Sequence, residues 1–169
     1  MSNHSETSAE CCPKFDPAPW DKKSHTWKDK RFIQDDVCQI FHIPMNMSKV
    51  VTRMWSKIQA ADAAPATADF LMLAYDPSPW KSELYMNITK DVPDAKMVML
   101  SGTFLSKVFD GGYNEVPKWI KSMEAFVKSQ GKVIKKHYFY YTTCPKCAKK
   151  YGHNYVIAFT EVSNNLHES

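Results

Sequence analysis

The stretch LSGTFLSKVFDGGYNEVPKWIKSMEAFVKSQGKVI, residues 100–134, decides the fold of this chain. It begins with a segment rich in Val, Phe, Leu and Thr that closes at Gly111-Gly112, the pattern of a β-strand followed by a turn. Asn114 is placed to cap a helix, and Pro117 is tolerated in its first turn because the amide that proline lacks would be unpaired there. Apolar residues then recur at helical spacing as far as Gly131, a candidate left-handed cap. The apolar face of this helix must therefore pack on a sheet.

The composition is that of one domain with more aromatic side chains than a core requires. The 169 residues are 44% hydrophobic and 13% aromatic, and they include five Trp. An excess of large flat side chains indicates a site for a lipophilic or planar ligand. The 22 basic and 18 acidic residues are mixed along the chain, so the net charge of +4 gives little support for a nucleic-acid surface.

The sequence favours a cytoplasmic protein without membrane association. Its apolar stretches fall short of the roughly 20 residues that span a bilayer, and its polar start lacks the apolar centre of a signal peptide. The five Cys are an odd number, which argues against a secreted disulfide framework and directs attention to thiol or metal chemistry.

Both halves of the chain show the same order of predicted elements: strand, helix, strand, strand. Residues 1–33 read as a polar tail and an extended aromatic arm, and residues 34–169 as one domain with a first unit at 34–95 and a second at 96–163. We expect an α+β fold in which duplicated βαββ units form antiparallel sheet with two helices. Before residues 100–134, we predict a strand at 37–43, a helix that is capped by Asn46 and ends at Ala60, and strands at 70–75 and 83–89. After the helix of residues 100–134, we predict strands at 133–142 and 154–162.

One motif resembles a known family. Gly102-Thr-Phe104, then Gly111-Gly112-Tyr113, then a helix that contains Trp119 and ends at Gly131 are similar to the second half of the GyrI-like domain of the SOUL/GyrI-like superfamily. That family includes the effector-binding part of some multidrug-responsive transcription regulators. The family's usual Gly-Pro-Tyr stands here as Gly-Gly-Tyr.

The resemblance implies a cleft that binds lipophilic, often planar or cationic, small molecules among aromatic side chains. Some stand-alone members, with a role in drug resistance, hydrolyse cyclopropane-bearing, DNA-alkylating natural products by opening the strained ring with water. The segment before Gln34 is too short for a helix-turn-helix module, so we expect a stand-alone monomer or homodimer without direct DNA binding.

The chain departs from the family at one position. Members commonly carry a buried Glu on the strand after the helix, where this sequence has Phe139. Either the acid has moved to Glu83 or Glu161, or the site does not recruit cations and polarise water in the family's way. Residues two apart on a strand share a face, so His137, Phe139 and Tyr141 are expected on one face.

A hydrolytic site needs a base, a donor for a developing oxyanion and an apolar wall. The candidate bases are Glu83 and Glu161, and the candidate donors are Tyr141 and His137. The plain alternative is that both acids face water and that aromatic residues on the helices are core. The candidate ligand-binding residues are Trp20, Trp27, Trp55, Trp80, Tyr113, Trp119 and Phe139.

The cysteines suggest a metal site that is structural, since the proposed chemistry needs no cofactor. Cys144-Pro-Lys-Cys147 resembles one half of a zinc knuckle, and Cys11-Cys12 together with His153 could supply the remaining ligands. The alternatives are free thiols in a loop and, less favoured, a redox dithiol. Cys38 reads as an ordinary core thiol.

Two functions remain open from the sequence. The first is a stand-alone GyrI-like hydrolase or detoxifying binder of planar compounds. The second is a non-catalytic sensor or binding module with a structural zinc site. An acidic side chain among the aromatic residues of the site would favour the first function.

Overall fold

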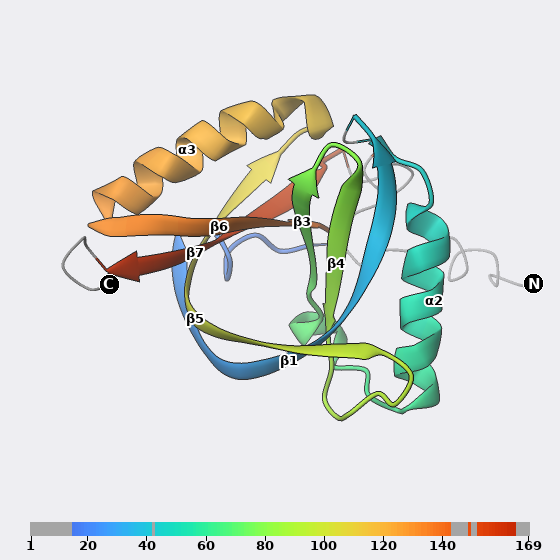
Figure 1. Ribbon diagram of the computed structural model, residues 1–169. Helices are drawn as coiled ribbons and strands as arrows, with labels where there is room; N and C mark the ends of the chain where they lie inside the picture. The colour runs from blue at the N-terminus through green and yellow to red at the C-terminus, as the bar shows by residue number, and fades with distance from the viewer. Residues whose placement is uncertain (1–14, 42, 143–148, 150–151, 165–169) are drawn as a thin grey trace, which may run out of the picture. The chain divides into compact units, whose positions relative to one another are not determined.

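The computed structural model describes residues 15–41, 43–142, 149 and 152–164. These residues form two α-helices and seven strands of antiparallel sheet, which confirms the predicted α+β fold (Figure 1). The strands and helices are β1 (Lys23–Ile40), β2 (Ile43–Pro44), α2 (Met47–Ala60), β3 (Met72–Ser78), β4 (Lys81–Asn87), β5 (Lys96–Asp110), α3 (Val116–Ser129), β6 (Lys132–Tyr141) and β7 (Tyr155–Asn164). None of the helices within the described residues is long and apolar enough to cross a membrane.

The chain divides into two compact units. The middle unit comprises residues 26–103, and the outer unit comprises residues 1–25 together with residues 104–169. Strands β1 and β5 therefore each begin in one unit and end in the other.

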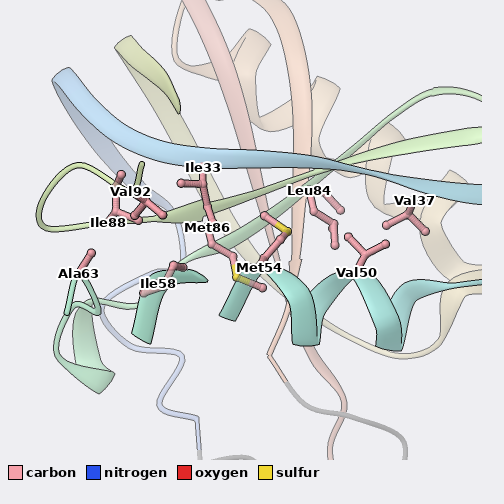
Figure 2. Close-up of a cluster of buried hydrophobic side chains, with 11 residues drawn as sticks. Ile33, Val37, Val50, Met54, Ile58, Ala63, Leu84, Met86, Ile88 and Val92 are labelled. Atoms are coloured by element: carbon pink, nitrogen blue, oxygen red, sulfur yellow. The ribbon is translucent and has the colours of Figure 1, made fainter. Parts of the chain in front are cut away.

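The middle unit is a sheet in the order β2-β1-β4-β3 with α2 on one face (Figure 1). Strands β1 and β4 are antiparallel, with Phe32 opposite Asn87 and Asp36 opposite Glu83. Apolar residues at intervals of four give α2 one buried stripe, which packs on alternate residues of the strands. Figure 2 shows this core, whose buried members are Ile33, Val37, Val50, Met54, Ile58, Ala63, Ala74, Leu84, Met86, Ile88 and Val92.

The outer unit places the helix of the opening stretch on the β6–β7 hairpin. Strand β7 lies between β6 and β5, and the buried residues of α3 are Trp119, Met123 and Val127. The Trp119 ring stacks on Phe109 at 5.5 Å and lies 6.5 Å from Phe139. The predicted amphipathic helix is therefore correct, and its apolar face does cover a sheet.

Several local predictions need correction. Helix α3 begins at Val116 behind Glu115, without a side-chain cap from Asn114. Asn46 does precede α2, but its Oδ1 accepts a hydrogen bond from the backbone N–H of Cys38 at 2.9 Å instead of capping the helix. Cys38 itself is exposed and is not a core thiol. The aromatic arm from Lys23 onward is already part of β1.

Candidate functional site

An acid, a phenol and an ammonium group meet on the face of the middle sheet opposite α2. Glu83 and Tyr85 are two apart on β4, so both point away from the core residue Leu84 between them. The Tyr85 hydroxyl donates a hydrogen bond to Glu83 Oε1 at 2.5 Å. Lys81 Nζ lies 3.7 Å from Glu83 Oε2 and 3.4 Å from Asp36 Oδ2. We call Asp36, Lys81, Glu83 and Tyr85 the acid–phenol cluster.

Aromatic rings adjoin this cluster. Phe32 is fully buried and meets the Tyr85 ring edge to face, with centroids 6.5 Å apart. Trp27 lies 6.0 Å from Phe32, and Lys30 Nζ stands over the Trp27 ring at 5.5 Å. The sheet face therefore carries an acidic group at one end of a continuous row of aromatic rings.

The cluster has the parts that general-base chemistry requires. The Glu83 side chain keeps 23% of its surface exposed, so solvent or a ligand can reach the carboxylate. The bond from Tyr85 fixes Oε1, and Lys81 lies 3.7 Å from Oε2, whose remaining lone pair can accept a proton from water. Sequence analysis identified Glu83 but missed Tyr85, although their spacing of two on a predicted strand places them on one face.

The other predicted catalytic residues, His137, Glu161 and Tyr141, lie in the outer unit. Within the β6–β7 hairpin, His137 pairs with Thr160 and Nδ1 lies 2.9 Å from the Thr160 hydroxyl. Glu161 is the next residue along β7 and therefore points to the opposite face, beside Lys136. Tyr141 ends β6. His137 and Glu161 thus cannot act on the same atom from this hairpin.

Burial sets the protonation of His137. Burial lowers its pKa from the ordinary value of 6.5, although the negative charge of Glu124 acts in the opposite direction. The ring is on the α3 side of the hairpin, as the predicted alternation with Phe139 requires.

The predicted ligand-wall residues are divided between the two units. Trp119 and Phe139 are packed beneath α3, and Trp55 of α2 meets Phe70 edge to face at 5.6 Å. Trp20 lies 5.8 Å from Phe159 in the outer unit, and Trp80 is 55% exposed in the turn between β3 and β4. The side chain of Tyr113 lies outside the described residues. Of the predicted wall, Trp27 is the residue that the contacts link to the acid–phenol cluster through Phe32.

A buried serine and a half-buried histidine form a pair that sequence analysis did not find. His25 Nε2 lies 2.8 Å from the Ser106 hydroxyl, which in turn donates to the carbonyl oxygen of Trp20 at 2.6 Å. Because that carbonyl can only accept, the single proton of Ser106 is committed to it, and His25 Nε2 must be the donor to Ser106. Ser106 is also fully buried. The pair therefore has a structural role and lacks the arrangement of a nucleophile and its base.

Most of the predicted zinc ligands are residues that the structure does not describe. Cys11, Cys12, Cys144 and Cys147 lie outside the described residues. His153 is described: its Nδ1 lies 2.7 Å from Asp110 Oδ2, and its ring stacks on Tyr155 with centroids 4.9 Å apart. A carboxylate on Nδ1 leaves Nε2 as the atom that would bind a metal. Among the described residues there is no group of three or more potential metal ligands.

Asp110 is held as a carboxylate by the same contacts. Burial alone would raise its pKa, but the hydrogen bonds from His153 and from the backbone N–H of Asn154, with the charge of His153, outweigh burial and lower the pKa below 3.8.

A pocket of about 300 Å³ also opens in the middle unit. Its lining includes Ile33, Asp35, Met54, Lys57 and Lys96, and it contains none of the predicted site residues. Its acidic residues are already paired, since Arg53 binds Asp35 at 2.8 Å and Lys81 binds Asp36. Asp36 therefore belongs both to the lining of this pocket and to the acid–phenol cluster, where it lies opposite Glu83.

The fold is shared with solved structures at low sequence identity. A hydrolase from Listeria innocua has 14% identity and a TM-score of 0.63, with 94% of this chain and 98% of that chain covered. The EcmrR C-terminal domain has 10% identity and a TM-score of 0.59, with 86% and 98% covered. SAV2435 bound to tetraphenylphosphonium has 10% identity and a TM-score of 0.50, with 88% and 97% covered. These likenesses are consistent with a GyrI-like fold.

Comparison of the sequence with family models identifies the family. None of the curated proteins is similar enough to match this chain. A family model described as "Bacterial hydrolase" matches residues 2–162, which is nearly the whole chain. The chain therefore belongs to the bacterial hydrolase family.

Proposed function

We propose that this protein binds a lipophilic, planar small molecule at the sheet face that carries Trp27 and Glu83, and hydrolyses it with Glu83 as general base. The observation that carries the proposal is the 2.5 Å hydrogen bond from Tyr85 to Glu83, beside the Phe32 and Trp27 rings. Trp27 is partly exposed and can stack on a planar ligand, whereas the Phe32 and Tyr85 rings are buried. The Glu83 carboxylate is the base that water attack requires.

The reaction would be the opening of a strained ring by water. Glu83 Oε2 takes one proton from a water molecule while the water oxygen forms a bond to a ring carbon. The carbon–carbon bond of the ring breaks, and its electron pair passes to the electron-withdrawing group conjugated with the ring. The proton held by Glu83 then returns to the product, so that substrate plus one water gives the open alcohol. Tyr85 keeps Glu83 in position throughout.

Two comparisons support the proposal. The family is described as bacterial hydrolases, and a solved relative in fold is named a hydrolase. SAV2435 was solved with tetraphenylphosphonium, a lipophilic cation with four aromatic rings. Glu83 is the acid that would attract such a cation here, and Trp27 already carries a cation over its ring.

The test separates binding from chemistry. Trp fluorescence is titrated with tetraphenylphosphonium and with a planar cyclopropane-bearing compound, and the second sample is followed by mass spectrometry. We expect saturable quenching and a product heavier by one water. Glu83→Gln should lower the turnover number at least 100-fold, as expected for loss of a general base, while quenching by the uncharged compound is retained.

The matched control is Glu161→Gln, which removes a strand carboxylate outside the acid–phenol cluster. This variant should keep full turnover. The proposal fails if Glu83→Gln keeps the wild-type turnover number, or if Glu161→Gln loses it instead.

The second candidate is a non-catalytic binder of lipophilic cations. It is favoured by the Glu83–Lys81–Asp36 contacts, in which two acids share one ammonium group and retain excess negative charge. It predicts quenching without product, and loss of tetraphenylphosphonium binding in Glu83→Gln.

A further inference from the structure

Five large apolar side chains gather at one end of the middle unit. They belong to the turn from β1 into β2 and to the turn from β3 into β4, which lie at the same end of their strands (Figure 1). We call them the apolar tip: Ile40, Phe41, Ile43, Met45 and Trp80, which are 48%, 71%, 64%, 61% and 55% exposed. Ile40 pairs with Ile43 and Phe41 contacts Trp80, and exposed apolar side chains gathered in this way mark an interaction site.

The two turns are fixed to each other. The Phe41 and Trp80 ring centroids are 5.0 Å apart. The backbone N–H of Gln39 donates to the carbonyl of Trp80 at 2.8 Å, and the buried Gln39 side chain donates to the carbonyl of Ser78 at 3.4 Å. The tip is thus a preformed surface, and binding to it requires little ordering of the backbone.

Phe41 is energetically unfavourable at its position for two reasons. Its φ of 49° lies in the left-handed region, which suits Gly or Asn and is unfavourable for a bulky aromatic residue. The residue is also 71% exposed, so burial within the chain offsets little of that strain. Strained residues that persist at exposed positions point to a function outside the fold.

The size of the tip fits a protein interface. Five side chains that are on average about three-fifths exposed, each of roughly 200 Å² when free, offer on the order of 600 Å² of apolar surface. This approaches the roughly 800 Å² per partner of a standard interface. Trp, Phe and Met are also the residue types that concentrate in interface centres.

The charges beside the tip favour a second copy over a membrane. Lys81 adjoins Trp80 and pairs with Asp36 at 3.4 Å, and Asp76 is exposed on β3 before the same turn. A lipid-binding tip would need an excess of Lys and Arg, which these residues lack. A surface with positive and negative charges at its edge can pair with the same surface of a second copy. In a dimer with a two-fold axis, each copy presents the same patch.

We propose that the apolar tip is the contact surface of a symmetric homodimer, with Phe41 and Trp80 at its centre. The two copies do not associate by pairing their β2 edge strands, because Pro44 of β2 has no N–H to donate. The contact is made by side chains that pack on those of the second copy.

The experiment measures self-association by sedimentation equilibrium over a wide concentration range, together with the thermal midpoint. Phe41→Asn should weaken dimerisation at least tenfold while the thermal midpoint of the monomer stays equal or rises, because Asn accepts a positive φ. Trp80→Ser should weaken dimerisation to a similar extent. Met99→Ser is the matched control, since Met99 is 65% exposed on β5 outside the tip and its loss should leave the dimer unchanged.

Three results would overturn the proposal. One is a wild-type protein that stays monomeric at about 100 µM. Another is a dimer that tolerates both Phe41→Asn and Trp80→Ser, which would place the interface elsewhere. The third is a monomer that sediments with phosphatidylcholine–phosphatidylserine vesicles unless Phe41 is replaced, which would make lipid the occupant.

Discussion

At the scale of single residues, His137 makes the folded state sensitive to pH. Its pKa is lowered by burial, so between the ordinary value of 6.5 and the lower folded value the unfolded chain binds more protons than the folded chain. Stability contributed by neutral His137 is therefore present above pH 6.5 and is lost as the pH falls through the folded pKa. His137→Gln, which keeps a polar group beside Thr160 but does not titrate, should remove this loss.

The measurement is the free energy of urea unfolding at pH values from 7.5 to 5 for both proteins. The wild-type curve should fall relative to the variant as the pH decreases. Parallel curves over this range would show that His137 has the same proton affinity in both states.

The site residues differ in how far sequence could predict them. Glu83 was identified as a candidate base, and Tyr85 could have been added, because period-two alternation puts both on one face. The His25–Ser106 contact joins residues 81 apart, and no local pattern reports such a pair. Trp119 is a different case, because its helical spacing is compatible both with a core residue and with a ligand-binding residue. Its packing between Phe109 and Phe139 assigns it to the core.

At the scale of the elements, Gly131 ends α3 and can be tested alone. Its φ is 69°, and a Cβ built on it meets no atom within 4 Å. Gly131→Ala should therefore destabilise the protein by about 1 kcal/mol through backbone strain and without a steric clash. Gly131→Asn should cost less, because Asn tolerates the left-handed region. Equal effects of Ala and Asn in denaturant unfolding would contradict a conformational origin.

Helices were easier to predict than strand ends. Both helices were predicted close to their observed bounds, since each has one apolar stripe with a four-residue repeat. Strand β1 was expected at 37–43 but spans Lys23–Ile40, because its first half is rich in Lys and Asp and gives no apolar alternation. Tertiary pairing extends this strand where local propensity does not.

At the scale of the whole molecule, zinc stays a prediction. Purified protein should contain about one zinc per chain if Cys11, Cys12, Cys144 and Cys147, or three of these with His153, bind it as a four-ligand site. Inductively coupled plasma mass spectrometry measures this directly. Cys147→Ser should lower the zinc content, whereas Cys38→Ser should not, because Cys38 is an exposed thiol on β1. A zinc content near zero in freshly prepared protein would leave the cysteines as free thiols.

The division of the chain into a middle and an outer unit has a consequence for its synthesis on the ribosome. Residues 26–103 are contiguous and can close as soon as they emerge, whereas Trp20 and His25 must wait for Phe159, against which both rings pack. At typical translation rates that delay is on the order of ten seconds. During that interval the nascent chain exposes the Trp20 and His25 rings, because their packing partner Phe159 has not yet been synthesised.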